Sequence, residues 1–238
     1  MIKSCRFFLV FLLTALILVF ITTCDNGTSS NDPVPEHNPV LVCFGNSLTE
    51  GYGAAVRDEV DTTQSYPAFL QEKLSIPIIN AGISGDTTIT GLARIHEDVL
   101  IHDPQMVIIE LGANDVKNFV MPDTTKSNLQ NIITLLNDGN RKIYLVKFYT
   151  EAVARKIITE FLTSDYNTQS ILIKTYDELF DSLASSNKVE LITDIWNGVL
   201  DEYLSDGIHP NAQGYKIMAD NYFSYLLPYL QKNNYLAK

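Results

Sequence analysis

From Val40 onward, short apolar runs alternate with longer amphipathic patterns, and this alternation limits the possible folds more than any other feature. The predicted strands are residues 40–44, 76–80, 106–111, 142–148 and 189–193. The predicted helices are residues 65–74, 89–101, 125–136, 165–183 and 211–230. Strands that are apolar almost throughout are typical of a parallel sheet buried on both faces. We therefore predict an α/β domain, a three-layer α/β/α sandwich with a five-stranded parallel sheet.

The first 23 residues have the pattern of an export signal. Lys3 and Arg6 precede an uncharged apolar run over residues 7–21. This run is shorter than the roughly 20 residues that a membrane-spanning helix needs. We therefore predict that residues 1–23 form a signal peptide.

The apolar run ends at Cys24, in a stretch that resembles a bacterial lipobox. Thr23 stands where such boxes usually carry Gly, Ala or Ser. Residues 24–39 are rich in Pro, Ser and Asn, which is typical of a flexible tether. We expect an exported lipoprotein of a bacterial cell envelope, anchored to a membrane by lipid at Cys24, with its folded domain at residues 40–238. An uncleaved signal anchor and plain secretion are the alternatives.

Charge and cysteine content argue against several classes of partner. The formal net charge is −11, and removal of Lys3 and Arg6 with the signal would take it to −13. Such a chain repels nucleic acid, so we predict no nucleic-acid partner. The three cysteines show no metal-binding spacing and the four histidines are widely spread, so we predict no metal site and no cofactor.

Small polar residues and glycines follow the first three predicted strands. They form the segments 45–51, 81–86 and 112–115. Because ligands of open parallel sheets bind at the carboxyl ends of the strands, these segments should meet at one site. Ser47 lies in the first segment, at a strand-to-helix turn, and is the candidate nucleophile.

A serine hydroxyl needs a base, and the candidate lies near the C-terminus. Asp206 and His209 are three residues apart, so the carboxylate can reach one ring nitrogen and leave the other for Ser47. Candidate oxyanion donors are the N–H groups of Ser47 and Gly82 and the side-chain amide of Asn114. Two nearby carboxylates, Asp86 and Glu110, receive no catalytic role, and Asp115 is expected to be a turn or capping residue.

Four segments in this order resemble the SGNH, or GDSL-type, hydrolase family, over about residues 40–230. They are GNSLTEGYG, INAGISGDTTITGLAR, LGAND and SDGIHPNAQGY. The resemblance is greatest to the arylesterase, thioesterase and lysophospholipase branch. It implies a flavodoxin-like fold, Ser47 as nucleophile, an oxyanion hole with Gly82 and Asn114, and an Asp206–His209 pair.

The resemblance also implies the reaction, hydrolysis of small carboxylic esters, thioesters or lysophospholipids through an acyl-enzyme. A carbohydrate O-acetylesterase is an alternative, and a non-catalytic surface-binding lipoprotein on a hydrolase scaffold is another. The last rests on Asn46, which replaces the aspartate of the GDSL signature. An apolar stripe at residues 153–162 also departs from the family, and we expect it to pack in the core or to line an acyl-chain wall. No oligomeric state is predicted.

Overall fold

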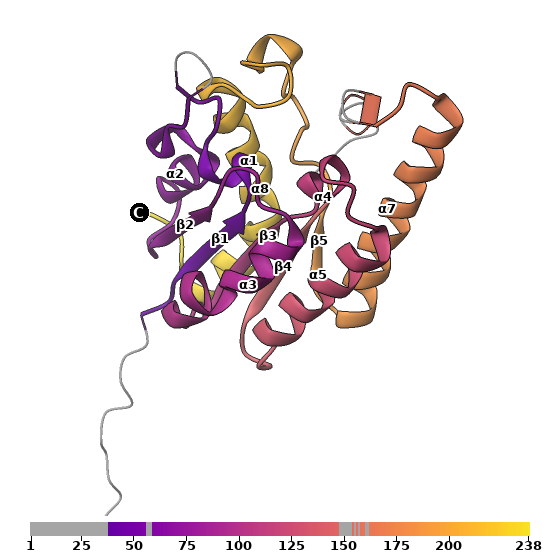
Figure 1. Ribbon diagram of the computed structural model, residues 1–238. Helices are drawn as coiled ribbons and strands as arrows, with labels where there is room; N and C mark the ends of the chain where they lie inside the picture. Colours follow the sequence, from indigo (N-terminus) through magenta and orange to yellow (C-terminus); the bar gives the residue numbers. More distant parts are fainter. Residues whose placement is uncertain (1–37, 56–58, 148–153, 155, 157, 160–161) are drawn as a thin grey trace, which may run out of the picture. The chain divides into compact units, whose positions relative to one another are not determined.

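The computed structural model describes residues 38–55, 59–147, 154, 156, 158–159 and 162–238, which fold around one parallel sheet (Figure 1). Its strands are β1 (Leu41–Gly45), β2 (Ile78–Gly82), β3 (Met106–Glu110), β4 (Lys142–Val146) and β5 (Glu190–Ile192). Every pairing between neighbouring strands is parallel, in the order β2-β1-β3-β4-β5. The predicted five-stranded parallel sheet is confirmed.

The position of β1 fixes where a site can form. It lies between β2 and β3, and Gly45 at its carboxyl end pairs in register with Gly82 and Glu110. The winding of the chain reverses between β1 and β3. In parallel sheets this reversal leaves a crevice beyond the carboxyl ends of the strands, where ligands bind.

Helices of several lengths connect the strands. The α-helices are α1 (Ser47–Glu50), α2 (Tyr66–Gln71), α3 (Thr88–Asp98), α4 (Ala113–Lys117), α5 (Pro122–Leu136), α7 (Tyr166–Asn187) and α8 (Ala212–Asn233). Short 3-10 helices are η1 (Thr62–Gln64), η2 (Leu100–His102) and η3 (Asp201–Tyr203).

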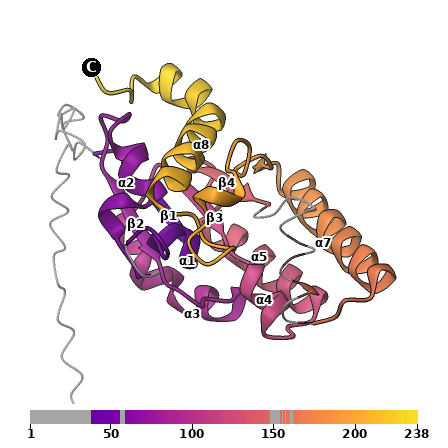
Figure 2. The same cartoon turned by 90° about the horizontal axis from the view of Figure 1, so that it is seen from above.

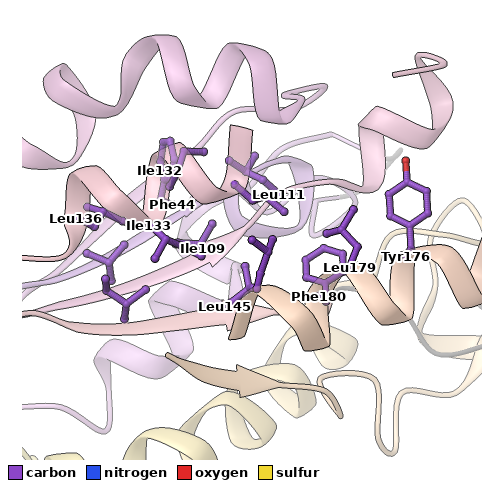
Figure 3. Packing of buried hydrophobic residues seen from close by; sticks show 14 of the residues in the cluster. Phe44, Ile109, Leu111, Ile132, Ile133, Leu136, Leu145, Tyr176, Leu179 and Phe180 are labelled. Atoms are coloured by element: carbon purple, nitrogen blue, oxygen red, sulfur yellow. The ribbon is translucent and has the colours of Figure 1, made fainter. Parts of the chain in front are cut away.

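The helices form two layers, one on each face of the sheet (Figure 2). Successive strand residues point to opposite faces, so each strand feeds both cores. Side chains of α3, α5 and α7 pack on one face around Phe44, Ile109 and Leu145 (Figure 3). Side chains of α2 and α8 pack on the other face around Cys43 and Ile108. The three-layer sandwich is confirmed.

The observed elements differ from the predicted ones mainly at their ends. Strand β2 runs from Ile78 to Gly82, two residues later than predicted, and directly follows Pro77, which has no N–H to donate to the sheet. Helix α5 begins earlier than predicted, with Pro122 in its first turn, where a missing N–H costs nothing. Helices α1 and α4 were not predicted, because each is too short to show an apolar period.

The stripe at residues 153–162 is described only in part. Ala154 and Ile158 are buried in the core beneath α5 and α7, and Leu162 packs against that core. Ile158 and Leu162 confirm the core-packing expectation for the described part of the stripe. Ile157 and Phe161 lie outside the described residues, so the acyl-chain wall remains a prediction.

The two ends of the chain differ in what the structure describes. Residues 1–37, with the predicted signal peptide, Cys24 and most of the tether, lie outside the described residues. In the described ranges, no helix combines the length and apolarity that crossing a bilayer requires. The C-terminal tail pairs with the segment after α2, where Ser75 N–H donates to the Tyr235 carbonyl and Ala237 N–H to the Lys73 carbonyl, each at 2.9 Å.

Candidate active site

Ser47 is the first residue of α1, directly after the central strand β1. Asn46 caps the helix, because its Oδ1 accepts the Leu48 N–H at 3.0 Å. Gly51 ends the helix after one turn with φ of 101°, a value that favours glycine. The Ser47 N–H has no acceptor among the described residues, as expected for the first turn of a helix. A hydroxyl and a free N–H are therefore presented together at the sheet's carboxyl edge.

The structure brings the predicted base and its partner to this serine. Ser47 Oγ lies 2.9 Å from His209 Nε2. His209 Nδ1 lies 2.6 Å from Asp206 Oδ2, and Asp206 Oδ1 accepts the N–H groups of Ile208 and His209 at 2.9 and 2.7 Å. One carboxylate thus shapes the turn and orients the imidazole, so that Ser47, His209 and Asp206 form a continuous hydrogen-bonded chain.

The electrostatics of this chain favour an ionised Asp206. Partial burial raises the pKa of Asp206, but hydrogen bonds from the His209 N–H, the His209 ring and the Ile208 N–H outweigh burial. The net pKa therefore lies below its ordinary value. An ionised carboxylate is the form that can hold the Nδ1 proton and stabilise an imidazolium.

An aromatic ring also packs against the imidazole. The Tyr52 ring lies against His209, with 4.6 Å between the ring centroids. Tyr215 Oη donates to the Tyr52 carbonyl at 2.6 Å and so ties this segment to α8. A side chain at Gly53, which has φ of 85°, would meet the Cβ of His209. The His209 imidazole is therefore positioned by packing as well as by hydrogen bonds.

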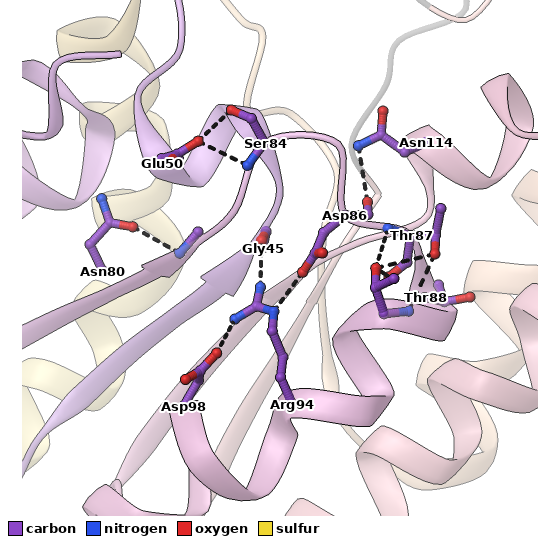
Figure 4. Close-up of polar contacts among 12 residues, drawn as sticks. Gly45, Glu50, Asn80, Ser84, Asp86, Thr87, Thr88, Arg94, Asp98 and Asn114 are labelled. Carbon is purple, nitrogen blue, oxygen red and sulfur yellow. Dashed lines mark hydrogen bonds and ion pairs between the residues drawn. The ribbon is translucent and has the colours of Figure 1, made fainter.

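The predicted oxyanion donors differ in their surroundings. Asn114 lies at the start of α4, and its Nδ2 donates to the Asp86 carbonyl at 2.9 Å (Figure 4). The Gly82 N–H already donates to Asn80 Oδ1 at 3.0 Å. A Cβ at Gly82 would overlap the backbone nitrogen of Glu50, so a glycine is needed there for close packing against α1. The oxyanion role of Gly82 remains a prediction, and its N–H has an acceptor in the present geometry.

A second glycine in the same loop was not singled out from the sequence. Gly85 is exposed, has φ of 86°, and its N–H finds no acceptor in the described part of the chain. Glu50 holds the loop by accepting from the N–H and hydroxyl of Ser84 (Figure 4). The paired glycines of the segment GISGD could have indicated Gly85, because only its turn requires positive φ.

Arg94 fixes the same loop from α3. Its guanidinium pairs with Asp86 at 2.5 Å and with Asp98 at 2.8 Å, and it donates to the Gly45 carbonyl at 3.0 Å. Figure 4 shows these contacts joining the β1 end, the loop and the helix. The carboxylate of Asp86 is therefore occupied by a structural ion pair.

The remaining polar groups near the site are buried. Asp115 accepts from the Thr88 N–H and hydroxyl at 2.8 and 2.5 Å and from Thr125 Oγ1 at 3.0 Å, so it ties α3 to α5. Glu110, at the end of β3, contacts Asn46 and Thr49, which flank Ser47 in the sequence. Within the described ranges, no three His, Cys, Asp or Glu side chains gather as a metal site would require.

The chain is similar to proteins named as esterases and thioesterases. The arylesterase of Vibrio mimicus is 28% identical over 188 residues, which cover 76% of this chain and 84% of that protein. Thioesterase 1/protease 1/lysophospholipase L1 of Escherichia coli K12 is 28% identical over 189 residues, which cover 76% of this chain and 79% of that protein. The crystal structure of TesA superimposes with a TM-score of 0.63 at 25% identity, over 79% of this chain and 98% of that chain.

A family-level comparison covers the whole region that carries the site. The sequence model of the GDSL-like lipase/acylhydrolase family matches residues 43–217. This match begins within β1, ahead of Ser47, and ends within α8, beyond His209. Together with the shared fold, it shows that the chain belongs to the GDSL-like lipase/acylhydrolase family.

Proposed function

We propose that this protein is a serine ester hydrolase that acts on small carboxylic esters, thioesters or lysophospholipids. The observation that carries the proposal is the continuous chain from Ser47 Oγ through His209 to Asp206, with distances of 2.9 and 2.6 Å. A serine hydroxyl is a weak nucleophile until a positioned base accepts its proton. Family membership and the arylesterase and thioesterase relatives support the same chemistry.

The first half of the reaction is acyl transfer to the enzyme. His209 Nε2 takes the proton of Ser47 Oγ as the oxygen attacks the ester carbonyl, and Asp206 stabilises the imidazolium. The tetrahedral oxyanion accepts from the Ser47 N–H and the Asn114 amide. The predicted third donor is the N–H of Gly82, which would have to break its hydrogen bond to Asn80 Oδ1 before it could bind the oxyanion. The N–H of Gly85, three residues later, has no acceptor among the described residues. The imidazolium then protonates the departing alcohol or thiol.

The second half releases the acid. Water gives its proton to His209 Nε2 and attacks the acyl carbon, and the same donors hold the second oxyanion. Collapse of this intermediate breaks the bond to Ser47 Oγ and returns the proton from His209 to the serine. The transfer between Ser47 and His209 uses two side chains that the structure already places in contact, and Asp206 contacts the same imidazole.

The test is ester hydrolysis by the full-length protein in detergent, with p-nitrophenyl esters from acetate to palmitate. We expect wild type to hydrolyse them, Ser47→Ala to lose the activity, and Ser224→Ala to keep it. Ser224 is an exposed serine on α8 and serves as the matched control. No hydrolysis of any ester by the folded wild type would contradict the proposal and favour a non-catalytic binding protein.

The chain-length profile separates the two enzymatic alternatives. A lysophospholipase should prefer long acyl chains and release fatty acid from lysophosphatidylcholine. A carbohydrate O-acetylesterase should prefer acetate and release it from an acetylated xylan. The two substrates, assayed side by side with Ser47→Ala as blank, decide between these substrate classes.

We also propose that the protein is exported and held on a cell-envelope membrane by lipid at Cys24. The support is the basic start, the apolar run and the cysteine that ends it. Growth with a labelled fatty acid should label the wild type and leave Cys24→Ala unlabelled. Equal label on both proteins would contradict the anchor.

A further inference from the structure

Glu110 is a buried acid that the proposed reaction does not use. It is the last residue of β3, it pairs in register with Gly45 of β1, and it is 0% exposed. Its Oε1 accepts from Asn46 Nδ2 at 3.2 Å and its Oε2 contacts Thr49 Oγ1 at 3.1 Å. A group buried this completely needs its polar partners, because an unpaired buried acid is costly.

The two partners of Glu110 lie on either side of the nucleophile. Asn46 caps α1 immediately before Ser47, and Thr49 follows within the same helical turn. Both side chains are buried, so neither has water as an alternative partner. We propose that Glu110 is a positioning residue, whose side chain holds Asn46 and Thr49 and thereby sets where α1 presents the Ser47 hydroxyl. This inference rests on the proposed esterase activity.

The surroundings of Glu110 favour its neutral form. The titratable groups that face it are the phenols of Tyr66 on α2 and of Tyr215 and Tyr222 on α8, all uncharged near neutral pH. No ion pair with a described residue offsets its charge. Burial raises the pKa of Glu110 from 4.5 to about 8, against hydrogen bonds from Thr49 and Asn46 that lower it.

A neutral Glu110 completes a hydrogen-bonded chain. One carboxyl oxygen accepts from Asn46, and the protonated oxygen can donate to the Thr49 hydroxyl. Thr49 Oγ1 lies 3.2 Å from Tyr66 Oη, so the Thr49 hydroxyl can in turn donate a hydrogen bond to the phenol oxygen. Ionisation above about pH 8 would place a negative charge beneath the turn whose N–H must bind an oxyanion. The turnover rate should therefore fall as Glu110 loses its proton.

With Asn46 in place, Glu110 is the one acid in this network. The aspartate of the GDSL signature would add a second acid at position 46. With aspartate at this position, two carboxyl groups would lie within hydrogen-bonding distance and would share one proton. A neighbouring carboxylate raises the pKa of its partner, so Asn46→Asp should move the ionisation of Glu110 to higher pH. The amide of Asn46 therefore sets the pH range in which this turn stays neutral.

The experiment measures kcat and KM of the full-length protein from pH 6 to pH 10 on one soluble p-nitrophenyl ester. In wild type, kcat should decline near pH 8. Glu110→Gln keeps a donor and an acceptor, so it should match wild type at pH 7 and lack the decline. Asn46→Asp should shift the decline upward, and the double variant Asn46→Asp/Glu110→Gln should abolish it. Glu72→Gln, at an exposed glutamate, should behave as wild type.

A further variant, Glu110→Leu, removes the contacts themselves. Glu110→Leu leaves Asn46 and Thr49 without this partner, so kcat at pH 7 should fall roughly 10- to 100-fold with little change in KM, because the nucleophile is displaced. Wild-type kcat in Glu110→Leu, or the same alkaline decline in wild type, Glu110→Gln and Asn46→Asp, would overturn the positioning role alone. If Glu110→Leu does not fold, the three pH profiles decide. An inactive wild type would overturn the esterase proposal, and this inference with it.

Discussion

Asp206 shows how one residue can serve the local turn and the proposed chemistry together. One carboxylate oxygen accepts the N–H groups of Ile208 and His209, and the other holds His209 Nδ1. Because both oxygens are engaged, the imidazole has one orientation and one tautomer, with Nε2 free to accept from Ser47. The short spacing of Asp206 and His209 made this pair predictable from the sequence alone.

Asp206→Asn should preserve the turn and lose the catalysis. The amide oxygen can still accept from the backbone, but the amide nitrogen cannot accept a proton from Nδ1. The imidazole is then held in the wrong tautomer, and kcat should fall by up to ~10⁴-fold. Kinetics and thermal unfolding, with the exposed Asp201→Asn as control, check this expectation. A kcat within a few fold of wild type would show that Asp206 does not orient the base.

Asn114 should contribute to the transition state more than to substrate binding. Its Nδ2 donates to the Asp86 carbonyl, and Asn114 lies within the third segment of the predicted site, residues 112–115. Loss of one oxyanion donor typically lowers kcat by about 10²- to 10³-fold. Asn114→Ala should show this loss in steady-state kinetics, whereas an increase in KM alone would assign Asn114 to substrate binding.

At the scale of elements, α1 is a single helical turn whose position depends on its neighbours. An isolated turn of this length has no stability of its own. Asn46 caps it, Gly51 ends it, and Gly45 and Gly82 let the ends of β1 and β2 approach it closely. Helix α1 was missed from the sequence for the same reason, since tertiary contacts and not an apolar period create it.

The two glycines of the β2–α3 loop should respond differently to substitution. Gly82→Ala places a methyl group against the Glu50 backbone, which cannot move aside, and overpacking of this kind costs about 1–3 kcal/mol or more. Gly85→Ala meets no atom within 4 Å and faces only its φ of 86°. That conformation costs an alanine about 1–2 kcal/mol. Urea unfolding should rank Gly82→Ala as the less stable protein, and the reverse order would contradict the close packing.

At the scale of the whole molecule, the sequence pattern predicts the arrangement of strands and helices but not the side-chain contacts between distant segments. The strands, their parallel pairing and the layers followed from apolar periodicity, which is a local property. The pairing of Glu110 with Asn46 spans 64 residues and depends on strand register, so no short segment shows it. The burial of Ile158 followed from the helical stripe of residues 153–162.

The buried Glu110 should make global stability depend on pH. Its pKa is 4.5 without burial and about 8 in the folded protein, so the folded state holds a proton that the unfolded chain has released. The contribution to stability is complete below pH 4.5, is lost progressively as pH rises toward 8, and is constant above that. The loss should be about 1.4 kcal/mol per pH unit.

Urea unfolding of wild type and Glu110→Gln at several pH values measures this effect as a difference. The free energy of unfolding of the variant should rise relative to wild type across pH 4.5–8 and then level off. Parallel curves for the two proteins would mean that Glu110 has the same pKa in the folded and unfolded states.

The hydrogen bond between Ser47 and His209 joins residues that are 162 positions apart in the sequence. The last residues of the chain also pair with the segment after α2. During synthesis, β1 and the proposed nucleophile therefore emerge long before the proposed base. Contacts of such long sequence separation form late in folding. If the protein is exported as proposed, the chain would pass through the translocation machinery as an inert precursor, and hydrolysis would begin only after its C-terminal helix has docked outside the cytoplasm.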